Sequence, residues 1–424
     1  MTLVASSPTD LAPATSPSGP VTRFDVVLAH DYLTQRGGGE RVALELARHF
    51  PDAPLITSVY DRDTTFPEFA DRDVRASVLN RVGPFRRDPR RAFGVLALVM
   101  GRMPVPAGVL LASSSGWAHG LRSHGPKIVY CHNPARWLYQ PDDYFSTLPP
   151  LARRLVGRAL APLRAWDRRA ARTAHTYVAN STSVARRIEA AYGVQAQVIH
   201  PPAGLDPQGP VQPVPGLEPG FFLTVGRRRG YKNTELVCEA VERTPGARLV
   251  AVGGLPGPRT WSERLTGVSG VSDAQLRWLY THCSAVVAMS HEDFGLSPVE
   301  GFAFGKPSVV LRAGGYLDSG LEGVATVYVD TEDAAALATA LAAFDPADFD
   351  ADAVRAHGER FSSAQFGRRL HELVAEVVDD SSLDDGAAGD DSIDDGAIDD
   401  GAIDDGAIDD GAIDDGAIDD GARS

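Results

Sequence analysis

Two carboxylates, Glu292 and Glu300, lie eight residues apart and flank a turn that contains Gly295. The turn follows an apolar run at 285–289 that is typical of a buried parallel strand, so it should lie at the strand's carboxyl end. The segment 297–300, SPVE, has the residue types of a helix N-terminus: a serine cap, a proline in the first turn and the glutamate of a capping box. Unpaired backbone amides and the helix dipole favour an anion at such an N-terminus. The stretch therefore predicts a diphosphate site beside two acidic side chains.

Two cations, Arg227 and Lys232, bracket the turn that follows a second apolar run, at 221–225. Charge-assisted hydrogen bonds from such side chains suit a phosphate oxygen. Residues 228 and 229 are also arginines, so a basic exposed loop is the alternative interpretation.

Apolar runs alternate with segments of helical period along most of the chain, which is typical of parallel α/β domains. The predicted fold is α/β, with two doubly wound, Rossmann-like domains that face each other across a cleft. Strands are expected at 24–29, 55–60, 109–112, 127–131, 176–179 and 198–200, and then at 221–225, 248–252, 285–289, 308–311 and 324–329. The predicted boundaries are 1–22 for a disordered leader, 23–205 for the first domain, 206–378 for the second and 379–424 for a disordered acidic tail.

The first predicted strand also ends in residues that could contact a ligand. Gly38 and Gly39 lie in a triple-glycine loop that opens a helix, where backbone can approach a ligand closely; a plain turn is the alternative. His132 follows the strand at 127–131, at the edge where open α/β sheets bind ligands. His119 and the pair at 30–31, a histidine and an aspartate, are rival candidates for the same role.

The acidic character of the chain is concentrated at its C-terminus. The net charge is −15, and the 18 aspartates and one arginine of 379–424 contribute −17, which leaves +2 for the other residues. The three cysteines form no CxxC pair, which argues against a disulfide framework or a metal cluster and favours the reduced cytoplasm. No signal peptide is recognisable, and the longest apolar stretch, 92–101, is about half of what a membrane span needs.

Taken together, these motifs resemble the retaining glycosyltransferases of family four, which have the GT-B fold. The resemblance covers roughly 24–378. In the second domain it rests on the E-x7-E spacing, the text FGLSPVEG inside it, and the strand–GR–YK element around 225–233. In the first domain it rests on GGER at 38–41, YCHNPARW at 130–137, and NS at 180–181 with HPP at 200–202. This second set is similar to mannosyltransferases that build bacterial surface polysaccharides.

The resemblance implies a role for each candidate residue. Arg227 and Lys232 would contact the diphosphate of a nucleotide-sugar donor, and Glu300 would accept hydrogen bonds from the ribose. Glu292 would contact the donor hexose at the reaction centre, and His132 would contact donor sugar or acceptor from the first domain. The donor site would also include Phe294, Gly295 and Leu296, with the loop of Gly38 and Gly39 opposite. No metal, cofactor or nucleic acid is expected; the D-x-D patterns at 61–63 and 71–73 lie in surface-like polar runs.

The expected reaction is transfer of mannose from GDP-mannose to a glycan or lipid-linked saccharide. A UDP-hexose donor and a non-catalytic nucleotide-sugar-binding protein are the alternatives; a sugar-nucleotide epimerase would require a Tyr-x3-Lys pair with a dinucleotide loop, and that combination is missing from the sequence.

Peripheral contact with the inner face of the cell membrane is a further expectation. The segment 153–172 is rich in arginine, and Leu151, Leu155, Ala159 and Leu163 recur near it at helical spacing. These apolar residues either pack inward as the buried stripe of a surface helix or belong to a basic face that rests on anionic lipid.

Overall fold

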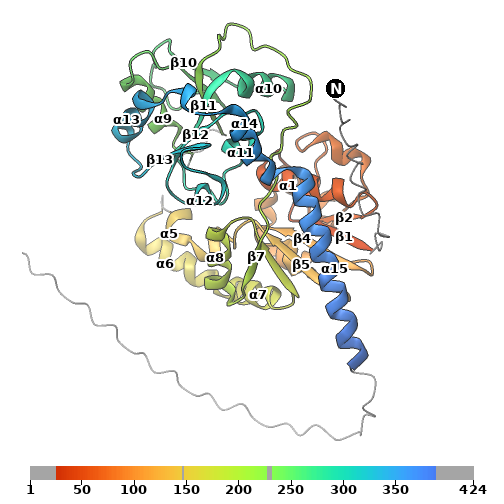
Figure 1. The fold of residues 1–424 in the computed structure, drawn as a ribbon. Coiled ribbons are helices and arrows are strands. Elements are labelled where there is room, and N and C mark those ends of the chain that lie inside the picture. Colours follow the sequence, from red (N-terminus) through yellow and green to blue (C-terminus); the bar gives the residue numbers. More distant parts are fainter. Residues whose placement is uncertain (1–24, 146–147, 227–231, 388–424) are drawn as a thin grey trace, which may run out of the picture. The chain divides into compact units, whose positions relative to one another are not determined.

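The computed structural model describes residues 25–145, 148–226 and 232–387. It contains two parallel sheets, which confirms the predicted pair of Rossmann-like α/β domains (Figure 1). The first sheet has the order β3-β2-β1-β4-β5-β6-β7 and the second has the order β10-β9-β8-β11-β12-β13. Both sheets belong to one unit, which ends at Ser381.

The strands are short, and most of their residues are buried, as expected for sheets covered by helices on both faces. The first sheet is formed by β1 (Val26–His30), β2 (Leu55–Thr57), β3 (Val74–Ala76), β4 (Val109–Ser114), β5 (Lys127–Cys131), β6 (Thr176–Ala179) and β7 (Ala196–Val198). The second is formed by β8 (Phe221–Val225), β9 (Leu249–Val252), β10 (Leu265–Val268), β11 (Cys283–Ala288), β12 (Ser308–Leu311) and β13 (Thr326–Val329).

Helices connect the strands. In the first half they are α1 (Gly38–His49), α2 (Gly83–Arg87), α3 (Phe93–Met100), α4 (Arg136–Tyr139), α5 (Pro141–Tyr144), α6 (Pro150–Ala159), α7 (Ala161–Ala171) and α8 (Thr182–Tyr192). In the second half they are α9 (Thr234–Arg243), α10 (Asp273–His282), α11 (Leu296–Ala303), α12 (Tyr316–Ser319), α13 (Ala334–Ala343), α14 (Ala351–Gly358) and α15 (Ser363–Ala387). In the part of the chain that the structure describes, none of the helices has the length and hydropathy of a membrane-spanning segment.

Each sheet has one point at which the strand order reverses. This point lies between β1 and β4 in the first sheet and between β8 and β11 in the second. Ligands of open α/β sheets bind beyond the carboxyl ends of the strands at such a point. The predicted ligand-binding residues follow β1, β5, β8 and β11, so the topology brings them to these two edges.

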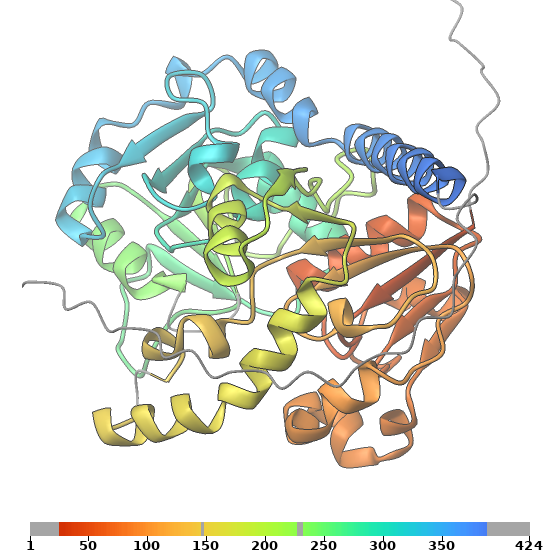
Figure 2. The same ribbon diagram turned by 90° about the horizontal axis from the view of Figure 1, so that it is seen from below.

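The helix α15 packs on the first sheet, although the sequence places residues up to 378 in the second domain. Its residues Phe366, Leu370 and Val374 share a buried cluster with Leu28 of β1 and Leu44 of α1. Figures 1 and 2 both show this helix beside the strands of the first sheet. The chain therefore returns to its first domain after completing the second.

The acidic tail was predicted to be disordered from 379, but α15 continues to Ala387. The part of the helix before 379 is anchored by its buried side chains, and the chain has neither glycine nor proline between 379 and 385 to interrupt it. The predictions of disorder for 1–22 and for the repeats after 387 lie outside the described residues.

Candidate active site

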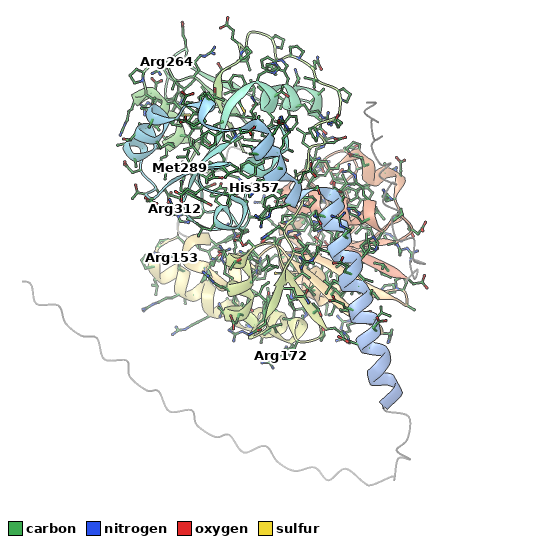
Figure 3. The ribbon with its side chains drawn as sticks, in the orientation of Figure 1. Arg153, Arg172, Arg264, Met289, Arg312 and His357 are labelled. Carbon is green, nitrogen blue, oxygen red and sulfur yellow. The ribbon has the colours of Figure 1, made fainter. Side chains whose placement is uncertain are left out.

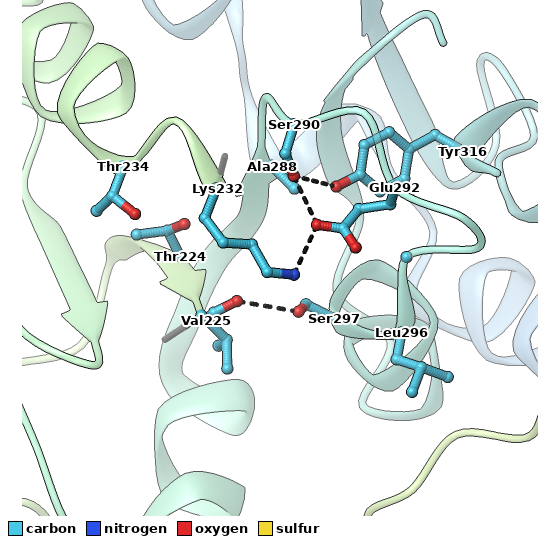
Figure 4. Close-up of a pocket in the computed structure, with 12 residues that line it drawn as sticks. Thr224, Val225, Lys232, Thr234, Ala288, Ser290, Glu292, Leu296, Ser297 and Tyr316 are labelled. Carbon is cyan, nitrogen blue, oxygen red and sulfur yellow. Dashed lines mark hydrogen bonds and ion pairs between the residues drawn. The ribbon is translucent and has the colours of Figure 1, made fainter. Parts of the chain in front are cut away.

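A pocket lies at the carboxyl ends of β8 and β11, where the strand order of the second sheet reverses (Figure 4). Its walls come from the end of β8, the start of α9, the turn after β11, the first residues of α11 and Tyr316 of α12. Five of the predicted residues or their neighbours meet here: Lys232, Glu292, Gly295, Leu296 and Ser297. The predicted cation and one predicted carboxylate thus share a single pocket.

Lys232 and Glu292 form an ion pair across this pocket. Lys232 Nζ donates to Glu292 Oε1 at 2.6 Å, and Ser290 Oγ donates to the same oxygen at 2.8 Å. The Ser290 hydroxyl also lies 3.2 Å from the Tyr316 hydroxyl. All three contacts are visible in Figure 4. The carboxylate therefore has a defined direction, and its charge is balanced by a cation that can also reach an anionic ligand.

The predicted capping box does not form. The helix α11 begins at Leu296, and its N-cap is Gly295, whose φ is +88°. Ser297 is already inside the first turn, and its Oγ donates to the carbonyl of Val225 at 3.2 Å. A Cβ at position 295 would lie 2.2 Å from the Tyr316 ring, so only glycine fits there. The start of α11 still lines the pocket, as predicted, but its N-cap is a glycine rather than a serine.

Glu300 is held by a tyrosine instead of by the helix N-terminus. The Tyr280 hydroxyl, which is fully buried, donates to Glu300 Oε2 at 2.5 Å. Burial raises the pKa of the Glu300 carboxyl, and the hydrogen bond from Tyr280 and the charge of Arg41 oppose that rise. Tyr280 thus occupies one carboxylate oxygen and leaves acceptor sites on the other.

We expect Tyr280→Phe to weaken donor binding about tenfold or more, with a smaller effect on kcat. The variant removes a hydrogen bond to a charged group, which is worth roughly 1.5–3 kcal/mol. The dissociation constant of the donor, measured by calorimetry, checks this. Tyr130→Phe is the matched control, since the hydroxyl of this buried tyrosine donates to the Ile199 carbonyl, a backbone group. Equal donor affinity in the Tyr280 variant and the control would contradict the predicted contact of Glu300 with the ribose of the donor.

The glycine loop of the first domain lies against both a histidine pair and the second domain. A Cβ at Gly38 would lie 3.5 Å from Leu296 Cδ1, so this loop contacts the start of α11. A Cβ at Gly39 would lie 3.5 Å from His30 and 3.7 Å from His132. The structure thus brings the predicted first-domain residues and the pocket of the second domain close together.

His132 is linked to His30 by Ser113, which was not among the site residues predicted from the sequence. Ser113 Oγ lies 2.8 Å from His132 Nε2 and 2.9 Å from His30 Nδ1. The register of the sheet explains this, because His30 of β1 pairs with Ser113 of β4 and His132 directly follows β5. The serine hydroxyl has one proton, so it donates to one ring and accepts from the other, which links the two tautomers.

Both histidines are neutral near pH 7. Burial lowers the pKa of His30 to about 4 and that of His132 to about 4, and the proximity of His30 adds to the effect on His132. A neutral imidazole can exchange hydrogen bonds with a sugar hydroxyl without bringing a charge.

The rival candidates, His119 and Asp31, belong to the interior of the first domain. Asp31 accepts hydrogen bonds from the amides of Ser115, Trp117 and Ala118, and so holds the loop after β4. His119 is buried, with Nε2 3.1 Å from Asp167 Oδ1. Their contacts are those of structural residues. Arg227, by contrast, lies outside the described residues.

Two family models match the sequence. Residues 36–207 match the model described as Glycosyltransferase Family 4, and residues 211–344 match the model described as glycosyl transferases group 1. The sequence has no significant match among curated proteins.

Several solved structures share the fold at low sequence identity. The structure of Anabaena HepE in complex with UDP-glucose has a TM-score of 0.60 and 17% identity, and the match covers 84% of this chain and 100% of that one. The sucrose-phosphate synthase of Thermosynechococcus elongatus also has a TM-score of 0.60 and 17% identity, over 84% of this chain and 99% of that one. A glycosyltransferase from Rickettsia africae has a TM-score of 0.55 and 16% identity, over 83% and 98%.

The two facing Rossmann-like domains define the class of protein as a GT-B protein. The two family matches, which follow one another along most of the described chain, support a family-four-like glycosyltransferase.

Proposed function

We propose that this glycosyltransferase moves a hexose from a nucleotide-diphosphate sugar to a hydroxyl group of a glycan or lipid-linked saccharide. The observation that carries the proposal is the Lys232–Glu292 pair beside the N-terminus of α11. A cation and helix amides suit the diphosphate, while a carboxylate held at 2.6 Å from that cation suits the hydroxyl groups of the sugar.

In this reaction the bond between the anomeric carbon and the diphosphate breaks, and a bond from the acceptor oxygen to the same carbon forms. Lys232, together with the amides at the start of α11, stabilises the negative charge that grows on the leaving diphosphate. The acceptor proton passes to an oxygen of that diphosphate. We propose that the configuration at the anomeric carbon is retained and that no metal takes part. Neutral His132 orients the sugar or acceptor hydroxyl from the first domain.

Two donors have specific support. The first-domain motifs around His132 favour GDP-mannose, and the similarity to the HepE complex with UDP-glucose favours a UDP-hexose. Purified protein should be incubated with each radiolabelled donor and an acceptor mixture, and both nucleotide release and labelled glycan should be measured. Label in the glycan from one donor supports the proposal. Binding without transfer supports a nucleotide-sugar-binding protein, and binding of no donor refutes both.

We also propose that α6 rests on anionic lipid, whereas Leu163 of α7 packs inward against a core cluster of the first domain. The alternative, that the leucines pack inward, fails for α6: Leu151 is 71% exposed, Leu155 is 57% exposed, and the helix contains no buried residue. Arginines flank these leucines, and Figure 3 labels Arg153 and Arg172 on this part of the first domain. Exposed leucines next to arginines are typical of helices that lie in a membrane interface.

We expect the protein to sediment with phosphatidylglycerol vesicles at low salt and to be released at high salt, because the attraction is largely electrostatic. Replacing Leu151 and Leu155 with aspartate should abolish sedimentation. Replacing Leu317 and Leu321, two exposed leucines of the second domain, with aspartate is the matched control. Absence of binding to anionic vesicles at low salt would end this proposal.

A further inference from the structure

The N-terminus of α8 in the first domain contacts two segments of the second domain that carry pocket residues. One is the turn after β11, which contains Glu292, and the other is α12, which begins with Tyr316. Ser181, the N-cap of α8, donates through Oγ to the carbonyl of Asp293 at 2.5 Å. Thr182 donates to Asp318 Oδ1 from its amide at 3.0 Å and from its hydroxyl at 2.5 Å. Asp293 directly follows Glu292, and Asp318 lies in α12, which begins with the pocket residue Tyr316.

The carboxylate of Asp293 is held by two arginines of the first domain. Arg187 Nη1, from α8, lies 2.5 Å from Asp293 Oδ1, and Arg136 Nη2, from α4, lies 2.7 Å from Oδ2. Arg187 Nη1 also donates to Asn133 Oδ1 at 2.9 Å, next to His132 in the chain. Each oxygen of the aspartate thus has its own guanidinium, which restricts both its position and its orientation.

The turn after β11 also contacts the glycines that precede α12. The amide of Gly315 donates to the carbonyl of Glu292 at 2.9 Å. A Cβ at Gly315 would lie 2.2 Å from Phe294 Cα, and one at Gly314 would lie 2.5 Å from the Glu292 carbonyl oxygen. Because these two segments are packed this closely, a displacement of Asp293 also displaces Glu292 through the backbone.

We infer that Asp293 is a positioning residue: gripped by Arg136 and Arg187, it sets Glu292 in its working geometry when the two domains are together. This inference rests on the proposed function of Glu292. The ion pairs are partly exposed, with side-chain exposures of 21% for Asp293, 29% for Arg187 and 38% for Arg136, and such pairs add only about 1 kcal/mol to stability. Their effect is therefore on geometry, where a displacement of about 1 Å costs roughly 10²-fold in rate.

The test compares Asp293→Asn with the matched control Asp330→Asn. Asp330 accepts from Arg312 at 2.6 Å within the second domain, so its variant also removes one acidic partner of an arginine. For Asp293→Asn we expect kcat to fall at least about tenfold, the donor dissociation constant to change less than about threefold, and the unfolding midpoint to stay within about 3 °C. The control should leave all three close to wild type. Asp293→Glu should recover part of kcat, because it keeps the charge.

Hydrogen exchange gives a readout that does not depend on activity. The amides of 290–295 should exchange faster in Asp293→Asn than in wild type or in Asp330→Asn. If wild type is active and kcat of Asp293→Asn is unchanged, the inference is overturned and the proposed function stays intact. The same conclusion follows if kcat of Asp293→Asn falls only together with lower stability and weaker donor binding. If wild type transfers no sugar at all, the proposed function fails, and exchange alone decides whether Asp293 holds this loop.

Discussion

Glu292→Gln is expected to lower kcat by about 10²–10³-fold, the usual cost of losing one electrostatic contact to a reacting group. The carboxylate oxygen Oε1 accepts from Lys232 at 2.6 Å and from Ser290 at 2.8 Å. Glutamine has nearly the same shape but no charge, and its amide cannot accept from both donors if it turns its nitrogen toward Lys232. The variant therefore disturbs the direction of the side chain and leaves the charge of Lys232 without its balancing carboxylate. Steady-state transfer at saturating donor measures the effect.

The control for this variant is Glu322→Gln, since Glu322 is an exposed carboxylate that pairs with Arg312 on the same domain. Donor affinity should be measured in parallel, because Lys232 without its partner is expected to keep its attraction for the diphosphate. Near-normal kcat in Glu292→Gln would remove this carboxylate from the reaction centre. Loss of folding would be visible as a lowered unfolding midpoint, and Glu292→Asp then tests the same group with its charge retained.

His30→Gln is expected to reduce the loss of stability that the protein suffers between about pH 6.5 and pH 4. Burial lowers the pKa of His30 in the folded protein to about 4, whereas the unfolded chain takes up the proton near 6.5. Between these values the unfolded state binds more protons than the folded state. The contribution of His30 to the free energy of unfolding therefore has its full value above about pH 6.5 and decreases as the pH is lowered to about 4. The shift corresponds to roughly 3 kcal/mol for this side chain.

The measurement is the free energy of unfolding in denaturant at several pH values across that window. His124→Gln is the control, because His124 is an exposed histidine. The difference between wild type and His30→Gln should change with pH more than the difference between wild type and the control does. A pH-independent difference for His30→Gln would show that this imidazole does not resist protonation in the folded state. His132, joined to it through Ser113, should show the same trend.

Much of the fold was predictable because strand and helix patterns are local. Runs such as 127–131 and 308–311 are apolar because both faces of a parallel strand are buried, and they are strands in the structure. The same regularity placed Lys232 and Glu292 at the carboxyl ends of neighbouring strands, and the structure brings them into one pocket. Local patterns were misleading where another group competes for the same atoms. Ser297 has the residue type of a cap, yet it lies in the first turn and its hydroxyl donates to the carbonyl of Val225. The N-cap is Gly295, where the positive φ and the contact with Tyr316 exclude a side chain.

The sequence by itself determined the alternating α/β pattern, the two domains and the chain positions of the cations and carboxylates, because these depend on neighbours within a few turns. Only the tertiary structure decided which residues that are distant in the sequence contact the same partner. Ser113 joins His30 to His132 through sheet register, Asp293 lies between arginines of two first-domain helices, and α15 returns to the first sheet. Such pairings arise from the order in which strands meet in a sheet and domains meet in space, and spacing along the chain does not record that order.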